Sequence, residues 1–262
     1  MVVLQVIGGG RMGEALASGL VAAGTVAAAG VRIVEPVEAR RTELAALLPG
    51  AEVTSEPGPS EGTVIAVKPQ HVADACRAAA AAGSGRVLSI AAGVTIAALE
   101  GALAPGTAVV RAMPNTPALV GKGAAAIAPG TAAGEDDLAW AEGLLGAVGT
   151  VVRVDEALLD AVTGLSGSGP AYVFLVAEAM IEAGAQAGLP REISTSLTIQ
   201  TILGAATLLA KGDDTPEELR AAVTSPGGTT AAGLRTLDDL GVRQAFVEAV
   251  AAATARSREL GA

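Results

Sequence analysis

The apolar residues of this chain change their pattern once, near Asp155. Before that point short apolar runs alternate with helical patterns, and after it helical periodicity is almost the only signal. Strands that alternate with helices predict a parallel sheet with helices on both faces. We therefore expect an α/β domain with a mostly parallel sheet at residues 1–155, followed by an all-α domain at residues 156–262.

The predicted elements follow from the same patterns. Six strands are expected at residues 2–7, 31–35, 64–67, 87–90, 109–113 and 151–154. Helices are expected at 12–23 and 39–48, and then at 156–188, 192–211, 216–223, 230–240 and 242–260. The fifth of these has a specific start signal, because Thr215 is followed by Pro216 and, three residues on, by Glu218, the pattern of a capping box.

Composition and charge exclude several classes of partner and several kinds of site. The length of 262 residues suits two domains, and the net charge of −10 argues against nucleic acid and anionic membranes as partners. The one cysteine, Cys76, excludes an internal disulfide and indicates a reducing, cytoplasmic location. The one histidine, His71, argues against a histidine-based metal site, so no metal is expected. We expect no signal peptide, because glycines interrupt the first apolar run.

The longest uncharged stretch, residues 193–210, is long enough to raise the question of a membrane span. It contains seven serine, threonine and glutamine residues (Ser194, Thr195, Ser196, Thr198, Gln200, Thr201 and Thr207). We interpret it instead as a helix buried between subunits.

A glycine-rich loop follows the first strand and opens the first helix. Gly8, Gly10 and Gly13 have the G-x-G-x-x-G spacing, in which the first glycine makes the turn, the second admits a pyrophosphate, and the third lets helix and strand pack closely. Arg11 and Met12 complete the loop. The alternative is a glycine-rich turn with no ligand.

Residues after three later strands are further candidates for cofactor contacts. Glu35 stands where an acid accepts from an adenine-ribose hydroxyl of NAD(H), whereas Arg40 and Arg41 could meet the 2′-phosphate of NADP(H), so the sequence leaves both cofactors open. The segment 67–69, which is Val67, Lys68 and Pro69, ends a strand at the expected ligand crevice. Asn115, between two prolines, could bond a cofactor amide or ribose.

A second anion-binding device of a different design lies near the C-terminus. Pro226 and the glycines Gly227 and Gly228 stand between Ser225 and the threonines Thr229 and Thr230, directly before a helical pattern. Backbone N–H groups of such a turn and of a helix N-terminus bind anions without lysine or arginine. Two unlike anion sites suggest a cofactor and a small anionic substrate.

Glycines and a proline also interrupt the helical stretch 156–188. Gly167, Ser168, Gly169 and Pro170 break an otherwise apolar pattern at a cost of about 1 kcal/mol for each glycine and 3 kcal/mol for the proline. Such a break is expected to serve close approach to a ligand, with Ser166 or Ser168 lining the site. The alternative is a crossing point between two helices.

Taken in order and spacing, these motifs resemble pyrroline-5-carboxylate reductase over essentially the whole chain, at residues 8–13, 66–69, 113–116, 166–172 and 222–230. The resemblance implies an N-terminal Rossmann domain and a helical domain that interleaves with a second subunit, in dimers or in decamers of five dimers. It implies hydride transfer from NAD(P)H to 1-pyrroline-5-carboxylate, giving L-proline. Thr230 would hold the substrate carboxylate, and Ser168 and Thr230 are the predicted catalytic residues. Arg11 departs from the family, in which asparagine or serine is frequent.

The chemistry of the residues agrees with this reaction. A protonated cyclic imine accepts hydride without a strong general acid, so positioning is the main requirement. A 3-hydroxyacid dehydrogenase of the same architecture needs a lysine on a helix of the second domain, and none of Lys68, Lys122 and Lys211 lies within residues 156–188. A reductase of another cyclic imino acid and a nucleotide sensor without turnover remain as alternatives.

Overall fold

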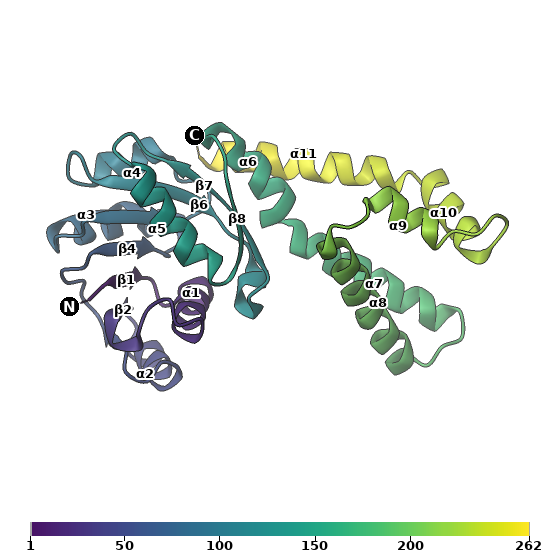
Figure 1. Cartoon of the computed structure of the whole chain (residues 1–262), viewed down its shortest axis with the longest axis horizontal. Helices are drawn as coiled ribbons and strands as arrows, with labels where there is room; N and C mark the ends of the chain where they lie inside the picture. The colour runs from purple at the N-terminus through teal and green to yellow at the C-terminus, as the bar shows by residue number, and fades with distance from the viewer. Residues whose placement is uncertain (1, 262) are drawn as a thin grey trace. The chain divides into compact units, whose positions relative to one another are not determined.

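The computed structural model describes residues 2–261 and separates into two compact units (Figure 1). The first unit runs to Ser168 and includes the end of the chain from Ala251, and the second runs from Gly169 to Val250. The predicted domain boundary at residue 155 remains a sequence prediction, and the compact units meet a little later in the chain.

The first unit contains a sheet of eight strands. They are β1 (Leu4–Ile7), β2 (Val31–Val34), β3 (Glu52–Thr54), β4 (Gly62–Ile65), β5 (Arg86–Ser89), β6 (Ala108–Met113), β7 (Gly123–Pro129) and β8 (Gly149–Arg153). Its helices are α1 (Arg11–Ala22), α2 (Glu38–Leu47), α3 (Val72–Ala81), α4 (Ile96–Ala102), α5 (Glu135–Gly146) and α6 (Leu159–Val162), with short 3₁₀ turns η1 (Ala28–Gly30), η2 (Pro69–His71), η3 (Thr116–Val120) and η4 (Glu156–Leu158).

The strands lie in the order β3-β2-β1-β4-β5-β6-β7-β8. All neighbours pair in parallel except β6 and β7, which are antiparallel. Strand β1 lies between β2 and β4, with Leu4 opposite Val31 on one side and Gly62 on the other. The chain therefore changes direction across the sheet between β1 and β4, and in such sheets a ligand binds outside the carboxyl ends of these two strands.

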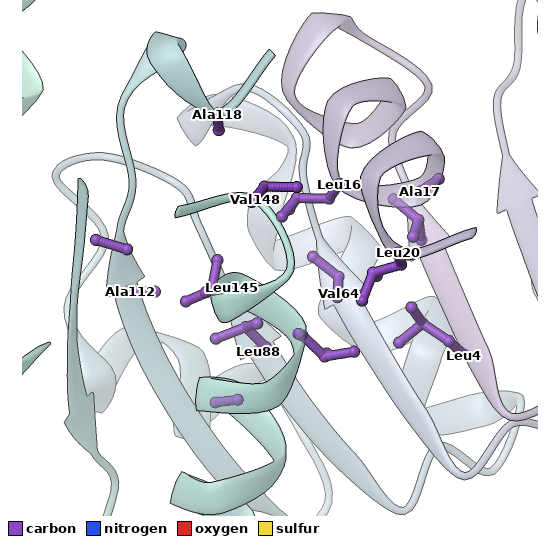
Figure 2. Close-up of a cluster of buried hydrophobic side chains, with 14 of the residues drawn as sticks. Leu4, Leu16, Ala17, Leu20, Val64, Leu88, Ala112, Ala118, Leu145 and Val148 are labelled. Carbon is purple, nitrogen blue, oxygen red and sulfur yellow. The ribbon is translucent and has the colours of Figure 1, made fainter. Parts of the chain in front are cut away.

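Helices bury both faces of the sheet. On one face the core joins side chains of α1, α2 and α5 to the strands, and Figure 2 shows Leu16 and Leu20 gathered with Val64 and Leu88. On the other face α3 and α4 pack on the strands, and Cys76 is fully buried there. Burial raises the pKa of the Cys76 thiol to about 11, so this side chain is a neutral packed thiol.

The six predicted strands and the two predicted helices of this unit are present, with ends shifted by a few residues. Five strands and helices of this unit were given no residue range from the sequence: β3, β7, α3, α4 and α5. Strand β7 has the sequence GAAAIAP, whose alanines favour strand weakly. It forms because β6 and β8 flank it and complete its backbone hydrogen bonds.

The predicted interruption of the helical stretch is also present. After α6 the chain makes a π-helical turn at Thr163–Gly167 (η5), and α7 begins at Gly169. Ser168 N donates to the carbonyl of Thr163 at 2.8 Å, which closes this wider turn. Extra residues of this kind inside helices are frequent at functional sites.

The second unit is entirely helical. It comprises α7 (Gly169–Gln186), α8 (Arg191–Lys211), α9 (Pro216–Ala222), α10 (Thr229–Asp239) and the first part of α11 (Val242–Leu260). The predicted capping box starts α9, with Thr215 Oγ1 accepting from Glu218 N at 3.2 Å and Glu218 Oε2 accepting from Thr215 N at 2.8 Å. The backbone and side-chain hydrogen bonds from Thr215 lower the pKa of Glu218.

Helices α7 and α8 cross closely where glycine meets serine. A Cβ built on Gly184 would lie 2.2 Å from Ser194 Oγ, and that hydroxyl donates to the carbonyl of Ile181 at 2.8 Å. Most large apolar side chains of the unit are exposed, including Phe174, Leu203 and Val247. A helical unit with so little internal core needs another surface to cover these side chains.

Helix α8 includes the predicted stretch 193–210. By length and composition it is the one helix among residues 2–261 that could cross a membrane, which is weak evidence by itself. Its buried residues are Ser194 and Thr198, whereas its leucines and isoleucines are largely exposed. The helix packs with its polar groups and exposes its apolar groups. This pattern fits a helix covered by a partner subunit as well as it fits a membrane span.

We predict that Leu203→Glu weakens self-association. Leu203 is 58% exposed on α8. Burying a leucine side chain contributes about 2 kcal/mol to the free energy of association. A symmetric dimer buries one from each subunit, so the variant loses about 4 kcal/mol. Leu47→Glu is the control, because Leu47 is 55% exposed on α2 of the first unit. Light scattering at several concentrations should show a loss of mass for Leu203→Glu alone. An unchanged mass for that variant would contradict the prediction.

Candidate functional site

The glycine loop joins β1 to α1 with no room for side chains at two of the three glycines of the G-x-G-x-x-G motif. Gly8 has φ +111°, a conformation that favours glycine, and a Cβ there would lie 2.6 Å from the carbonyl oxygen of Ala66. A Cβ on Gly13 would lie 2.0 Å from the carbonyl oxygen of Gly8. At Gly10, which caps α1, a Cβ would meet no atom within 4 Å. The loop therefore packs tightly on its inner side and stays open at Gly10.

A cavity of about 320 Å³ lies beside this loop, at the carboxyl ends of β4, β5 and β6. Five predicted cofactor residues line it: Met12, Val67, Lys68, Pro69 and Asn115. Sequence reasoning missed the segment Ile90, Ala91 and Ala92, which also lines it. The signal was available, since these residues directly follow β5 and the ends of parallel strands border the ligand crevice.

A second cavity, of about 460 Å³, lies on the other side of Gly10. Its walls are Gly10, Arg11, Glu14, Arg40 and Leu119. Three of these were predicted as cofactor residues, and Glu14 and Leu119 were not. The first turn of α1, with its unpaired N–H groups, borders both cavities, through Met12 in the first and Arg11 in the second, and this suits a pyrophosphate.

Glu35 and Arg40 are hydrogen-bonded to the glycine loop from the side of β2 and α2. Glu35 Oε2 accepts from Gly9 N at 3.0 Å, and Arg40 Nε donates to the carbonyl of Gly9 at 2.9 Å. The second carboxylate oxygen of Glu35 accepts from Val37 N at 3.0 Å. The loop is thus fixed before any ligand binds.

Asn115 uses its side chain to join three segments. Its Nδ2 donates to the carbonyl of Ser166 at 3.0 Å, and its Oδ1 accepts from Ala124 N at 2.8 Å. The side chain is 9% exposed. Asn115 therefore fixes the wall of the cavity. One N–H of Nδ2 and one lone pair of Oδ1 are left over, and their hydrogen bond to a cofactor amide or ribose remains a prediction.

The predicted substrate residues lie in the second unit, at the start of α10. Gly227 has φ +71°, and Gly228 N donates to the carbonyl of Ser225 at 3.0 Å, which closes a tight turn. Gly228 caps the helix, so Thr229 and Thr230 occupy its first turn and both are exposed. Their backbone N–H groups have no partner within the helix and can bind a carboxylate.

The two predicted catalytic residues lie in different units, Ser168 at the end of the first and Thr230 in the second. Ser168 follows Gly167, which lines the 320 Å³ cavity. Among residues 2–261, no group of three or more His, Cys, Asp and Glu side chains is placed to hold a metal ion.

A dinucleotide fits the residues of the first unit. The open face at Gly10, the helix N-terminus and the two cavities beside it provide a place for a pyrophosphate with its two nucleoside ends.

Two family models match the chain. Residues 156–260 match the model described as pyrroline-5-carboxylate reductase dimerisation, and residues 3–93 match the one described as NADP oxidoreductase coenzyme F420-dependent. A pyrroline-5-carboxylate reductase from Synechocystis sp. is 46% identical over 266 residues, 98% of each chain. The chain belongs to the pyrroline-5-carboxylate reductase family. This membership confirms the predicted resemblance.

Solved structures of pyrroline-5-carboxylate reductases agree with the fold. The enzyme from Coxiella burnetii is 34% identical, with a TM-score of 0.92 over 99% of this chain and 98% of that chain. The Plasmodium falciparum enzyme, whose structure has NADP bound, is 29% identical with a TM-score of 0.86, over 100% of this chain and 98% of that one. The predicted fold class, a mostly parallel α/β domain followed by a helical dimerisation domain, is confirmed for this reductase.

We predict that Gly13→Ala and Gly10→Ala separate folding from cofactor binding. In a helix alanine is favoured over glycine by about 1 kcal/mol. The melting temperature of Gly13→Ala should nevertheless fall, because the added methyl group clashes with the carbonyl oxygen of Gly8. Gly10→Ala should fold normally, since nothing lies within 4 Å, and should bind nicotinamide dinucleotide more weakly by calorimetry. Normal binding by Gly10→Ala would contradict a pyrophosphate at this loop.

Proposed function

We propose that this protein reduces 1-pyrroline-5-carboxylate to L-proline with NADH or NADPH, the last step of proline biosynthesis. The observation that carries the proposal is the family membership over the full length of the chain, with relatives named for this reaction. The turn at residues 225–230 supports it independently, because its exposed N–H groups fit a small carboxylate.

Local dipoles must hold that carboxylate. The chain has a net charge of −10, so its overall field repels an anionic substrate. The segment from Ser225 to Thr230 contains no lysine or arginine. In our proposal the backbone N–H groups of Thr229 and Thr230 and the hydroxyl of Thr230 donate to the carboxylate, with the positive end of the α10 dipole behind them.

Orientation supplies most of the catalysis that the residues provide. Bound reduced nicotinamide supplies the hydride for C5 of the ring, and the protonated imine becomes the amine of proline. The ring therefore needs no strong general acid during this step. In our proposal Thr230 holds the substrate carboxylate and Ser168 stays a predicted catalytic residue. Positioning of the substrate contributes up to about 7–11 kcal/mol of barrier lowering.

The protein self-associates through its dimerisation domain, which the family model matches at residues 156–260. We propose that the helices of two copies interleave, and that five such dimers assemble into a decamer. The exposed apolar side chains of α7 and α8 support an interleaved contact, because they need covering. We also propose a cytoplasmic protein that binds neither nucleic acid nor membrane, on the basis of its acidic charge and its single buried thiol.

We predict loss of nicotinamide absorbance when 1-pyrroline-5-carboxylate is added to the purified protein with NADH or NADPH. Formation of proline in equal amount identifies the product. The six-membered cyclic imino acid is the comparison substrate, and faster reduction of that ring would favour the alternative imine reductase. Binding of the cofactor without turnover of either imine would instead indicate a nucleotide sensor.

We predict that Thr230→Ala raises KM for the imine by about 10- to 100-fold, because a hydrogen bond to a charged group contributes about 1.5–3 kcal/mol. KM for the cofactor should change little. Thr236→Ala is the matched control, since Thr236 is on the same helix and its hydroxyl donates to the carbonyl of Ala232. An equal rise of both KM values in Thr230→Ala would place Thr230 outside the substrate site.

A further inference from the structure

We propose that this reductase selects NADH over NADPH through two carboxylates, Glu35 and Glu14. Glu35 takes the hydroxyls of the adenine ribose, and Glu14 occupies Arg40, the arginine otherwise placed to meet a 2′-phosphate. The inference rests on the proposed function only in requiring that a nicotinamide dinucleotide binds at the glycine loop.

Glu35 is held in one orientation at the end of β2. Each of its carboxylate oxygens accepts one backbone N–H at 3.0 Å, from Gly9 and from Val37. A carboxylate has about four acceptor sites, so both oxygens can still accept from ribose hydroxyls. A phosphate ester in place of the 2′-hydroxyl lacks that proton and carries negative charge, and Glu35 repels it.

Arg40 is already engaged on all three of its guanidinium nitrogens. Nε donates to the carbonyl of Gly9 at 2.9 Å, Nη1 donates to Glu43 at 2.8 Å, and Nη2 pairs with Glu14. The hydrogen bond that Arg40 donates to Glu43, and then the one that it donates to Glu14, raises the pKa of Arg40. Two carboxylates therefore offset its single charge, and a phosphate has to displace at least one of them.

The neighbouring arginine is engaged as well. Arg41 Nη1 donates to the carbonyls of Glu35 and Pro36, at 3.0 and 2.7 Å, and so holds the end of the strand. The remaining cation of this cavity, Arg11, is on the first turn of α1, where the pyrophosphate is expected. Arg40 and Arg41, which the sequence suggested as partners of a 2′-phosphate, are thus both hydrogen-bonded to protein groups. Glu35, the predicted partner of the ribose, is held at the end of β2.

Calorimetry of NADH and NADPH binding, without imine, tests the proposal independently of turnover. Wild-type protein should bind NADH at least about tenfold more tightly, the effect of one hydrogen bond to a charged group. Glu35→Ser should weaken NADH binding and strengthen NADPH binding. Glu14→Gln, which keeps the shape of the side chain and removes its charge, should strengthen NADPH binding by a larger factor than NADH binding.

Glu38→Gln is the control for net charge, because Glu38 is exposed on the first turn of the same helix as Arg40. It should change neither affinity. Equal or tighter binding of NADPH by the wild type would overturn the selection and leave the proposed function standing. A gain in NADPH affinity by Glu38→Gln equal to that of Glu14→Gln would also overturn it, since general charge would then suffice. Absence of binding of both cofactors would overturn the proposed function itself.

Discussion

The close approach of helix α1 to strand β1 is the contact on which the first unit depends. The helix comes so near that a single methyl group at Gly13 would overlap the carbonyl oxygen of Gly8. At this distance the apolar side of α1 reaches the central strands, where Leu16 and Leu20 are buried. The same approach points the helix N-terminus at the crevice between β1 and β4. Core packing and the cofactor site therefore share one cause.

Both proposed anion sites solve the same electrostatic problem. The protein is strongly acidic, so neither a dinucleotide nor a carboxylate is attracted over a distance. Each site instead presents backbone N–H groups at the start of a helix, α1 in the first unit and α10 in the second. Such dipoles act within a few ångströms, which makes binding depend on local geometry more than on net charge.

The second unit is organised for contact with another copy. Its helices have few buried residues, and they approach each other closely through small ones such as Gly184 and Ser194. Membership in a family with a dimerisation domain explains why so many apolar side chains are exposed in the single chain. For such a protein the stability of this unit depends on protomer concentration.

The sequence by itself determined the features that arise from local chemistry. Alternating strands and helices, the helical second half, the capping box at Thr215 and the spacing of the loop glycines all depend on neighbours within a few residues. Tertiary structure decided what depends on distant partners. Strand β7 exists because two strands flank it, Asn115 is held by Ala124 and Ser166, and Arg40 meets Glu14 from 26 positions away. The proposed choice of NADH over NADPH belongs to this second group, because in our proposal it depends on the side chains paired with the arginines, and only folding brings those side chains together.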